Sequence, residues 1–209
     1  MRVKICGMRS AEDIALCVRA GADALGFIFT DGPRRLTVEV AAVLTARVPA
    51  FVTVVGVFAD APDDLIRAAT ARCRVDVLQF CGDEAARRRG SFGKPTIAVI
   101  RDGCVPDAQE LTLARAVAVM LDARAPDGGA RGGTGVRVSP DEAARARRAV
   151  RADFILAGGL TPANVGDAIE SVRPDAVDVS SGVELRGQKD ARLVRAFVLA
   201  AKEAAHART

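Results

Sequence analysis

Short apolar runs rich in β-branched residues alternate along the chain with longer amphipathic segments. Each run has the length of one strand, and each amphipathic segment repeats its apolar residues at helical spacing. Strands are predicted at residues 2–6, 23–29, 51–58, 75–80, 96–100, 116–122, 153–157 and 176–180. Helices are predicted at residues 10–20, 38–47, 61–73, 140–150 and 162–172, with a long last helix beginning near residue 190.

The strict alternation of strands and helices indicates a parallel sheet with right-handed crossovers. Eight such units match a closed (β/α)8 barrel, so residues 1–209 are expected to form one compact TIM-barrel domain. An open doubly wound sheet is the alternative, and it is disfavoured because no GxGxxG turn follows the first strand. Only residues 107–113 are available for a helix after the fifth strand, and a glycine-rich loop at 124–135 follows the sixth. Long loops at that end of a barrel usually serve the ligand.

The first strand carries polar side chains on one face. Val3 and Ile5 alternate with Lys4 and Cys6, which places an ammonium group and a thiol on the same face. A helix-capping pattern begins at Ser10, so Cys6 stands where a strand ends and a helix is about to begin. Taken alone, Cys6 is typical of a small buried hydrophobe, but this edge of an α/β protein is where ligands bind.

Other strand ends carry complementary groups. Gln79 lies near the end of the fourth strand, and Asp122 ends the sixth. Asp178 lies on the eighth strand, which neighbours the first in a closed barrel, so we predict an inward-facing ion pair between Lys4 and Asp178. Cys6 and Asp122 end strands on opposite sides of the barrel, and a thiolate base with a carboxylic acid is what acid/base isomerisation requires. That chemistry needs nearby cations and a helix N-terminus to lower the pKa of the thiol.

Two glycine-containing loops follow the seventh and eighth strands. Glycines there let backbone amides approach an anion, and these loops are the usual phosphate site of barrel enzymes. The GGTG segment at 132–135 is a weaker signal, which reads equally well as a mobile lid. The predicted phosphate-binding residues are Gly158, Gly159, Ser180, Ser181 and Gly182.

Composition narrows the function classes. The formal net charge of +4 could suggest nucleic-acid binding, but the basic residues are scattered and the chain has no Trp or Tyr for base stacking. No apolar run is long enough to span a membrane, and no signal peptide is evident, so we expect a cytoplasmic protein. The odd number of cysteines, 5, does not form a disulfide framework. The only histidine is His206, which argues against a histidine base or a histidine metal site.

With these features the chain resembles the phosphoribosylanthranilate isomerases of tryptophan biosynthesis. The resemblance runs in order over nearly the whole chain, and KICG and VDVSSGVE are its most specific motifs. The matching segments are KICGMR at 4–9, GADALGFIF at 21–29, Arg35, VGVF at 55–58, LD at 121–122, GGTG at 132–135, LAGGLTPANV at 156–165, VDVSSGVE at 177–184, Gly187, Lys189 and Asp190.

The resemblance implies an Amadori rearrangement of N-(5-phosphoribosyl)anthranilate to 1-(2-carboxyphenylamino)-1-deoxyribulose 5-phosphate. Cys6 would be the base that removes the proton from ribose C2, and Asp122 the acid that protonates the ring oxygen. Arg35 would face the anthranilate carboxylate. No metal or organic cofactor is implied, and the expected partner is a small phosphorylated substrate, bound by a monomer or homodimer. Further predicted substrate-binding residues are Gln79, Gly133 and Asp178.

The chain departs from the family pattern at two places. Cys81 stands where the family commonly has His, and residues 136–138 replace an aromatic pair that usually follows GGTG. Among rival barrels, the histidine-pathway isomerases resemble a two-aspartate design, whereas this chain has Cys6 at the end of the first strand. A metal-dependent epimerase would need His ligands, and a Schiff-base aldolase would need a lysine on a central or late strand. A barrel that binds a phosphorylated ligand without turnover is the alternative outside the enzyme class.

Overall fold

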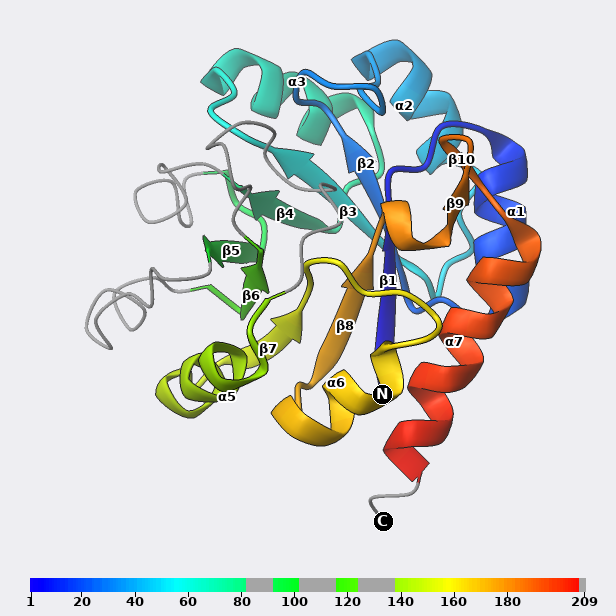
Figure 1. Cartoon of the computed structure of the whole chain (residues 1–209). Helices are drawn as coiled ribbons and strands as arrows, with labels where there is room; N and C mark the ends of the chain where they lie inside the picture. The colour runs from blue at the N-terminus through cyan, green and yellow to red at the C-terminus, as the bar shows by residue number, and fades with distance from the viewer. Residues whose placement is uncertain (82–91, 102–115, 124–137, 207–209) are drawn as a thin grey trace.

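The barrel closes in sequence order. The computed structural model describes residues 1–81, 92–101, 116–123 and 138–206. Each strand pairs in parallel with the next, and the last strand pairs with the first (Figure 1). The TIM-barrel prediction is therefore confirmed. The strands are β1 (Arg2–Cys6), β2 (Ala24–Ile28), β3 (Thr53–Phe58), β4 (Val77–Phe80), β5 (Thr96–Arg101), β6 (Ala118–Asp122), β7 (Asp153–Leu156) and β8 (Ala176–Val179).

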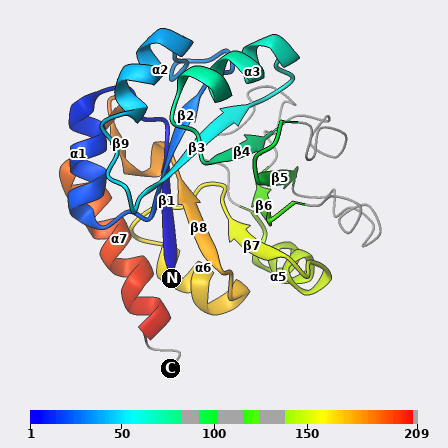
Figure 2. The ribbon, with the colours of Figure 1, turned by 180° about the vertical axis from the view of Figure 1, so that it is seen from behind.

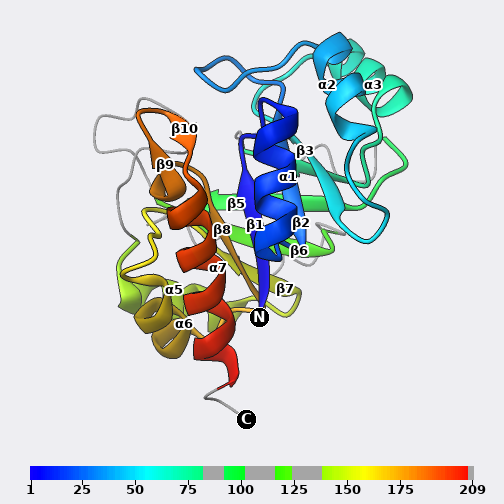
Figure 3. The ribbon, with the colours of Figure 1, turned by 90° about the vertical axis from the view of Figure 1, so that its right-hand side faces the viewer.

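The helices form an outer layer around the strands. Figure 2 shows α2 and α3 together at the top of the molecule and α5 and α6 at the bottom, and Figure 3 shows α1 and α7 packed side by side. No helix in the described ranges is long and apolar enough to cross a membrane. The predicted helix at 107–113 and the loop at 124–135 lie outside the described residues. The helices are α1 (Ala11–Ala20), α2 (Val38–Thr45), α3 (Asp63–Arg72), α5 (Pro140–Ala149), α6 (Val165–Val172) and α7 (Ala191–His206).

Several strands are shorter than the apolar runs that predicted them. The run at 75–80 begins as a strand only at Val77, because the Asp76 carboxylate accepts a hydrogen bond from the Val54 amide of the neighbouring strand at 2.8 Å. The run at 176–180 ends at Val179, and a 3₁₀ turn, η1 (Ser181–Val183), follows. After it comes a hairpin that the sequence pattern did not predict, made of β9 (Glu184–Leu185) and β10 (Gln188–Lys189).

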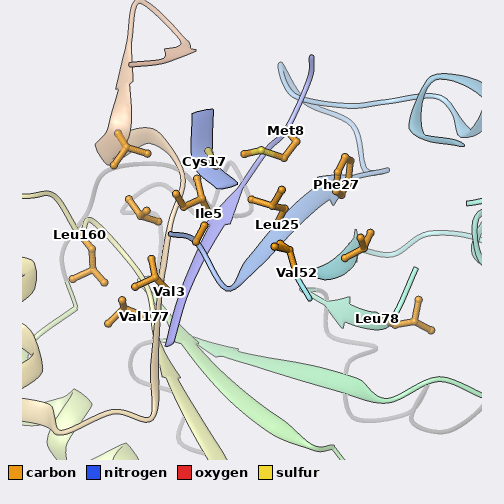
Figure 4. Close-up of a cluster of buried hydrophobic side chains, with 14 of the residues drawn as sticks. Val3, Ile5, Met8, Cys17, Leu25, Phe27, Val52, Leu78, Leu160 and Val177 are labelled. Carbon is orange, nitrogen blue, oxygen red and sulfur yellow. The ribbon is translucent and has the colours of Figure 1, made fainter. Parts of the chain in front are cut away.

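Successive strand residues separate two apolar layers. Val3 and Ile5 point outward into the core between strands and helices, which Figure 4 shows together with Cys17 and Leu25. Cys6 belongs to the second layer, the barrel interior. The other buried members of that interior cluster are Val55, Val57, Ile97, Ala118, Met120, Ile155, Ala157 and Ala176. Strand alternation therefore turns the polar face of β1 into the barrel.

Candidate active site

The predicted ion pair lies inside the barrel. Lys4 and Asp178 are directly opposite each other in the β1–β8 pairing, and Lys4 Nζ lies 2.7 Å from Asp178 Oδ1. Their side chains are only 4% and 10% exposed, so both charges are buried. Burial disfavours the ammonium form of Lys4, but the Asp178 carboxylate and the nearby Cys6 thiol outweigh that effect and raise the pKa of Lys4. Lys4 is therefore a permanent cation beneath the mouth of the barrel.

Cys6 ends β1 two residues beyond Lys4 and is buried. Burial raises the pKa of its thiol above the usual value, and the Asp178 carboxylate acts in the same direction. Lys4 opposes this by its charge and by a hydrogen bond to the thiol, and Lys189 opposes it by charge. The cations that the chemistry requires are thus present, but the desolvation of Cys6 outweighs them, and the pKa of its thiol is raised rather than lowered.

The loop after β8 is tied to the end of β1. Ser180 Oγ donates a hydrogen bond to the Cys6 carbonyl at 3.2 Å. Lys189 Nζ donates to the Ser180 carbonyl at 3.0 Å and to Glu184 Oε1 at 2.7 Å. The Lys189 side chain is only 1% exposed, so these hydrogen bonds to the loop after β8 are made by a buried ammonium group.

A hollow at the barrel mouth collects most of the predicted site residues. It is lined by Asp122, Gly158, Gly159, Asp178, Ser180, Ser181 and Gly182, together with Ala157, Leu160, Thr161 and Val179. Gly158 and Gly159 have φ values of 84° and 62°, a region that favours glycine. A Cβ on Gly182 would lie 1.8 Å from the Leu160 carbonyl oxygen, so only glycine lets these two loops meet. These two loops therefore form the backbone surface at which the sequence predicts that a phosphate binds.

Asp122 reaches this hollow from β6. Its Oδ1 accepts a hydrogen bond from the Ala123 amide at 2.9 Å, which orients the carboxylate at the strand end. Cys81 directly follows β4, and the charges of Asp122 and Cys6 both raise the pKa of its thiol. The three groups therefore share one electrostatic environment. Burial raises the pKa of the Cys81 thiol to about 12, and Gln79 Nε2 lies 3.3 Å from its sulfur. At neutral pH Cys81 is a neutral group that contacts Gln79.

Cys6, Gln79 and Arg35 are not among the residues that line the hollow. Gln79 is 4% exposed and is paired in register with Val57 and Ile97, both members of the interior cluster, so its side chain lies within the barrel. Arg35 lies on the loop after β2, where it pairs with Asp31, and 53% of its side chain is exposed. Gly133 lies outside the described residues. The structure therefore brings Asp122 and the proposed phosphate loops together, whereas Arg35 lies outside the hollow.

Sequence reasoning missed a buried ionic cluster next to these loops. Arg34 and Lys189 both donate hydrogen bonds to the Glu184 carboxylate. Burial alone would raise the pKa of Glu184, but the hydrogen bonds and positive charges of these two residues outweigh burial and lower that pKa to about 2. One sequence signal could have indicated this cluster. Glu184, the last residue of VDVSSGVE, and Lys189 carry opposite charges and are close together in the sequence. Among the described residues, no group of three or more His, Cys, Asp or Glu side chains is placed to hold a metal ion.

Comparisons with known proteins agree with this geometry. A family model described as N-(5'phosphoribosyl)anthranilate (PRA) isomerase matches residues 3–200. The N-(5'-phosphoribosyl)anthranilate isomerase of Geobacter sulfurreducens is 44% identical over 204 residues, which cover 97% of this chain and 98% of that protein.

Solved structures of the same enzyme share the fold. The phosphoribosyl anthranilate isomerase of Thermus thermophilus has a TM-score of 0.83 and 33% identity, with 97% of this chain and 99% of that chain covered. A phosphoribosyl anthranilate isomerase in complex with reduced 1-(o-carboxyphenylamino)-1-deoxyribulose 5-phosphate has a TM-score of 0.80 and 31% identity, with the same coverage. From its matching sequence and its barrel, we conclude that the chain belongs to the N-(5'-phosphoribosyl)anthranilate isomerase family.

Proposed function

We propose that this protein catalyses the Amadori rearrangement of N-(5-phosphoribosyl)anthranilate, with Cys6 as general base and Asp122 as general acid. The observation that carries the proposal is the hollow in which the Asp122 carboxylate and the glycine loops after β7 and β8 meet, next to the end of β1. The loops offer backbone amides for the phosphate, and the acid and the thiol can act on the sugar between them. Arg35 is proposed to face the anthranilate carboxylate once substrate is bound.

The reaction divides into two proton transfers. Asp122 donates a proton to the ring oxygen, the C1–O bond breaks, and the nitrogen lone pair forms a cationic imine at C1. Cys6, as thiolate, then removes the proton from C2, and the released electron pair forms the C1–C2 double bond while neutralising the nitrogen. The resulting enol becomes the ketone when C1 takes up a proton and the C2 hydroxyl releases one, so that the electron pair of the O–H bond forms the C2=O double bond. No step needs a metal or a redox group.

The buried cations make this chemistry possible at a desolvated thiol. Lys4 is held in place by Asp178 and lowers the energy of the Cys6 thiolate. Lys189 adds a second positive charge from the loop after β8. When the imine forms, its charge also favours the thiolate at the moment when the C2 proton is removed. In this proposal Lys4 and Lys189 stabilise the thiolate, as a histidine often does beside a catalytic cysteine.

The proposal extends to the setting of the enzyme. The free thiols of Cys6, Cys17, Cys73 and Cys81 fit a reducing cytoplasm. We expect a monomer or a homodimer that binds a small phosphorylated substrate and neither nucleic acid nor membrane.

The direct test mixes the protein with freshly prepared phosphoribosylanthranilate and follows the loss of its anthranilate fluorescence. Turnover is expected in the wild type, with kcat lowered by about a hundredfold or more in Cys6→Ala and in Asp122→Ala. A wild type that binds the substrate without turnover would reject the isomerase assignment. Near-normal kcat in either variant would remove that residue from its role.

A further inference from the structure

Each of the two proposed phosphate loops has a carbonyl group that a side chain holds by a hydrogen bond. In the loop after β7, Asn164 Nδ2 donates to the Gly159 carbonyl at 3.0 Å. In the loop after β8, Lys189 Nζ donates to the Ser180 carbonyl, also at 3.0 Å. Asn164 and Lys189 do not line the hollow, so both side chains contact these loops from outside it.

The direction of these two carbonyl groups determines where the next amide points. In a trans peptide the C=O of one residue and the N–H of the next share a plane and point in opposite directions. Because the carbonyls of Gly159 and Ser180 point to side chains outside the hollow, the N–H groups of Leu160 and Ser181 point the other way. Leu160 and Ser181 both line the hollow. Neither N–H group donates to an acceptor within the described part of the chain, so both are available to an anion.

The Asn164 side chain has one defined orientation. Its Oδ1 accepts a hydrogen bond from the Thr161 amide at 2.7 Å, while its Nδ2 donates to Gly159. A carboxamide turned by 180° would place a donor against the N–H group and an acceptor against the carbonyl, so only this orientation satisfies both contacts. Asn164 directly precedes α6, and it therefore fixes the peptide between Gly159 and Leu160 relative to that helix.

The Lys189 ammonium group is also held in place. Its Nζ lies 2.7 Å from Glu184 Oε1, and Glu184 in turn accepts two hydrogen bonds from Arg34. A buried ammonium group with a fixed carboxylate partner has little freedom to move, and its hydrogen bond to the Ser180 carbonyl is charge-assisted. Lys189 therefore fixes the peptide between Ser180 and Ser181.

The two loops are joined to each other and to the end of β1. A Cβ on Gly182 would lie 1.8 Å from the Leu160 carbonyl oxygen, so the loops are in direct contact there. Ser180 Oγ donates a hydrogen bond to the Cys6 carbonyl at 3.2 Å. A phosphate bound by both loops would therefore occupy a fixed place relative to Cys6.

We infer that Asn164 and Lys189 are positioning residues of the phosphate site, which direct the N–H groups of Leu160 and Ser181 into the hollow. This inference rests on the proposed function, in which the loops after β7 and β8 hold the substrate phosphate. Neither side chain touches the phosphate or the reacting atoms. Amides from two loops bind one phosphate well only when both point at it, so the loss of either side chain weakens phosphate binding.

Two ligands that differ only in the phosphate test this role. One is reduced 1-(o-carboxyphenylamino)-1-deoxyribulose 5-phosphate, and the other is the same compound after a phosphatase has removed its phosphate. The fluorescence of the anthranilate group measures Kd for both. In Asn164→Ala and in Lys189→Met, Kd for the phosphorylated ligand should rise by about tenfold, the effect of losing one hydrogen bond to a charged group. Kd for the dephosphorylated ligand should stay within about twofold, because it has no phosphate for the amides to bind.

Backbone amide resonances test the direction of the two N–H groups without any substitution. In the wild type, the amide protons of Leu160 and Ser181 should move downfield when the phosphorylated ligand binds, because each donates to an anion. The dephosphorylated ligand should not produce these shifts. The shift of Leu160 should shrink in Asn164→Ala, and the shift of Ser181 should shrink in Lys189→Met.

A matched control and a neutral variant separate this role from others. Lys202→Met is the control for Lys189→Met, because Lys202 Nζ also donates to a backbone carbonyl, at 2.8 Å after α1, and it should leave Kd for both ligands unchanged. Asn164→Ala removes no charge, so its effect cannot come from a lost attraction between an ammonium group and the phosphate. Glu184 retains Arg34 when Lys189 is replaced, and thermal unfolding establishes that each variant is folded.

Three outcomes would overturn the positioning role. Equal losses for both ligands would mean that the two side chains support the fold of the whole site. A loss in Lys189→Met with none in Asn164→Ala would mean that charge matters and amide direction does not. Unmoved Leu160 and Ser181 resonances in the wild type would mean that these amides do not bind the phosphate. A wild type that shows the shifts but does not turn over phosphoribosylanthranilate would instead reject the proposed function, so the two failures are distinguishable.

Discussion

Lys4 and Asp178 form a buried ion pair across the seam where β1 meets β8, with 2.7 Å between Nζ and Oδ1. The two residues are direct partners in the β1–β8 register, so their contact joins the first and last strands of the barrel at the level of the site. A buried pair contributes little net stability by its presence, but an unpaired buried charge is costly. The arrangement therefore leads to a stability prediction that distinguishes single from double variants.

Lys4→Met should lower the free energy of unfolding by about 3–5 kcal/mol, because it leaves the Asp178 carboxylate buried without its partner. Lys4→Met/Asp178→Leu removes both charges and should regain most of that loss. Urea unfolding followed by circular dichroism measures both values. If the double variant is as unstable as the sum of the single variants, the two charges are not coupled as the geometry requires.

The pH dependence of catalysis should report the Cys6 thiol. Because burial raises the pKa of this thiol in the free protein, the thiolate fraction should increase with pH, and kcat/KM should rise with it into the alkaline range. Lys4 lowers the energy of the thiolate, so Lys4→Met should move the rising limb to higher pH. Lys202→Met is the control, because Lys202 contacts Gly21 and Asp23 away from the site. The same limb position in the wild type and in Lys4→Met would contradict the proposed role of Lys4.

Glu184 should make stability depend on acid pH. Arg34 and Lys189 hold the pKa of its carboxyl at about 2, below the usual 4.5, so its stabilising contribution is complete above pH 4.5 and is lost as pH falls toward 2. Glu184→Gln should lower the free energy of unfolding at pH 7 by about 2 kcal/mol, through weaker hydrogen bonds. Its stability should also fall less steeply between pH 4.5 and 2. Urea unfolding at several pH values tests this, and parallel curves for both proteins would argue against it.

The local sequence pattern was sufficient to predict the barrel and to identify much of the candidate site. The two-residue period of a strand placed Lys4 and Cys6 on one face, and closure of eight parallel strands then made Asp178 a neighbour of Lys4. Glycine-containing turns after β7 and β8 were identifiable because their backbone requirements are local. Strand starts were less accurate, because turn aspartates such as Asp76 accept hydrogen bonds from a neighbouring strand.

The ionic cluster and the thiol environment could not be read from the sequence. Arg34 and Glu184 are separated by 150 positions, so their contact depends on the positions of two loops in the finished barrel. The direction of the Cys6 pKa depends on a balance between desolvation and the charges of Lys4, Lys189 and Asp178. Sequence indicates which charges are present, but the balance follows from how deeply the thiol is buried.

Gly26 offers a test of how closely Cys6 must be placed. It pairs with Cys6 across β1 and β2, and a Cβ added there would lie 2.7 Å from the Cys6 sulfur and 3.1 Å from its Cα. The sulfur can rotate away but the backbone cannot, so Gly26→Ala should displace the thiol and lower kcat by about tenfold or more.

Gly166→Ala is the matched control for this substitution. Gly166 lies in α6, and a Cβ there would meet no atom within 4 Å. It should leave kcat unchanged and raise stability by up to about 1 kcal/mol, since alanine favours the helix. Steady-state kinetics and thermal unfolding of both variants provide the comparison. If Gly26→Ala keeps full kcat while remaining folded, then the position of the Cys6 sulfur does not limit the reaction, and its role as the base would be wrong.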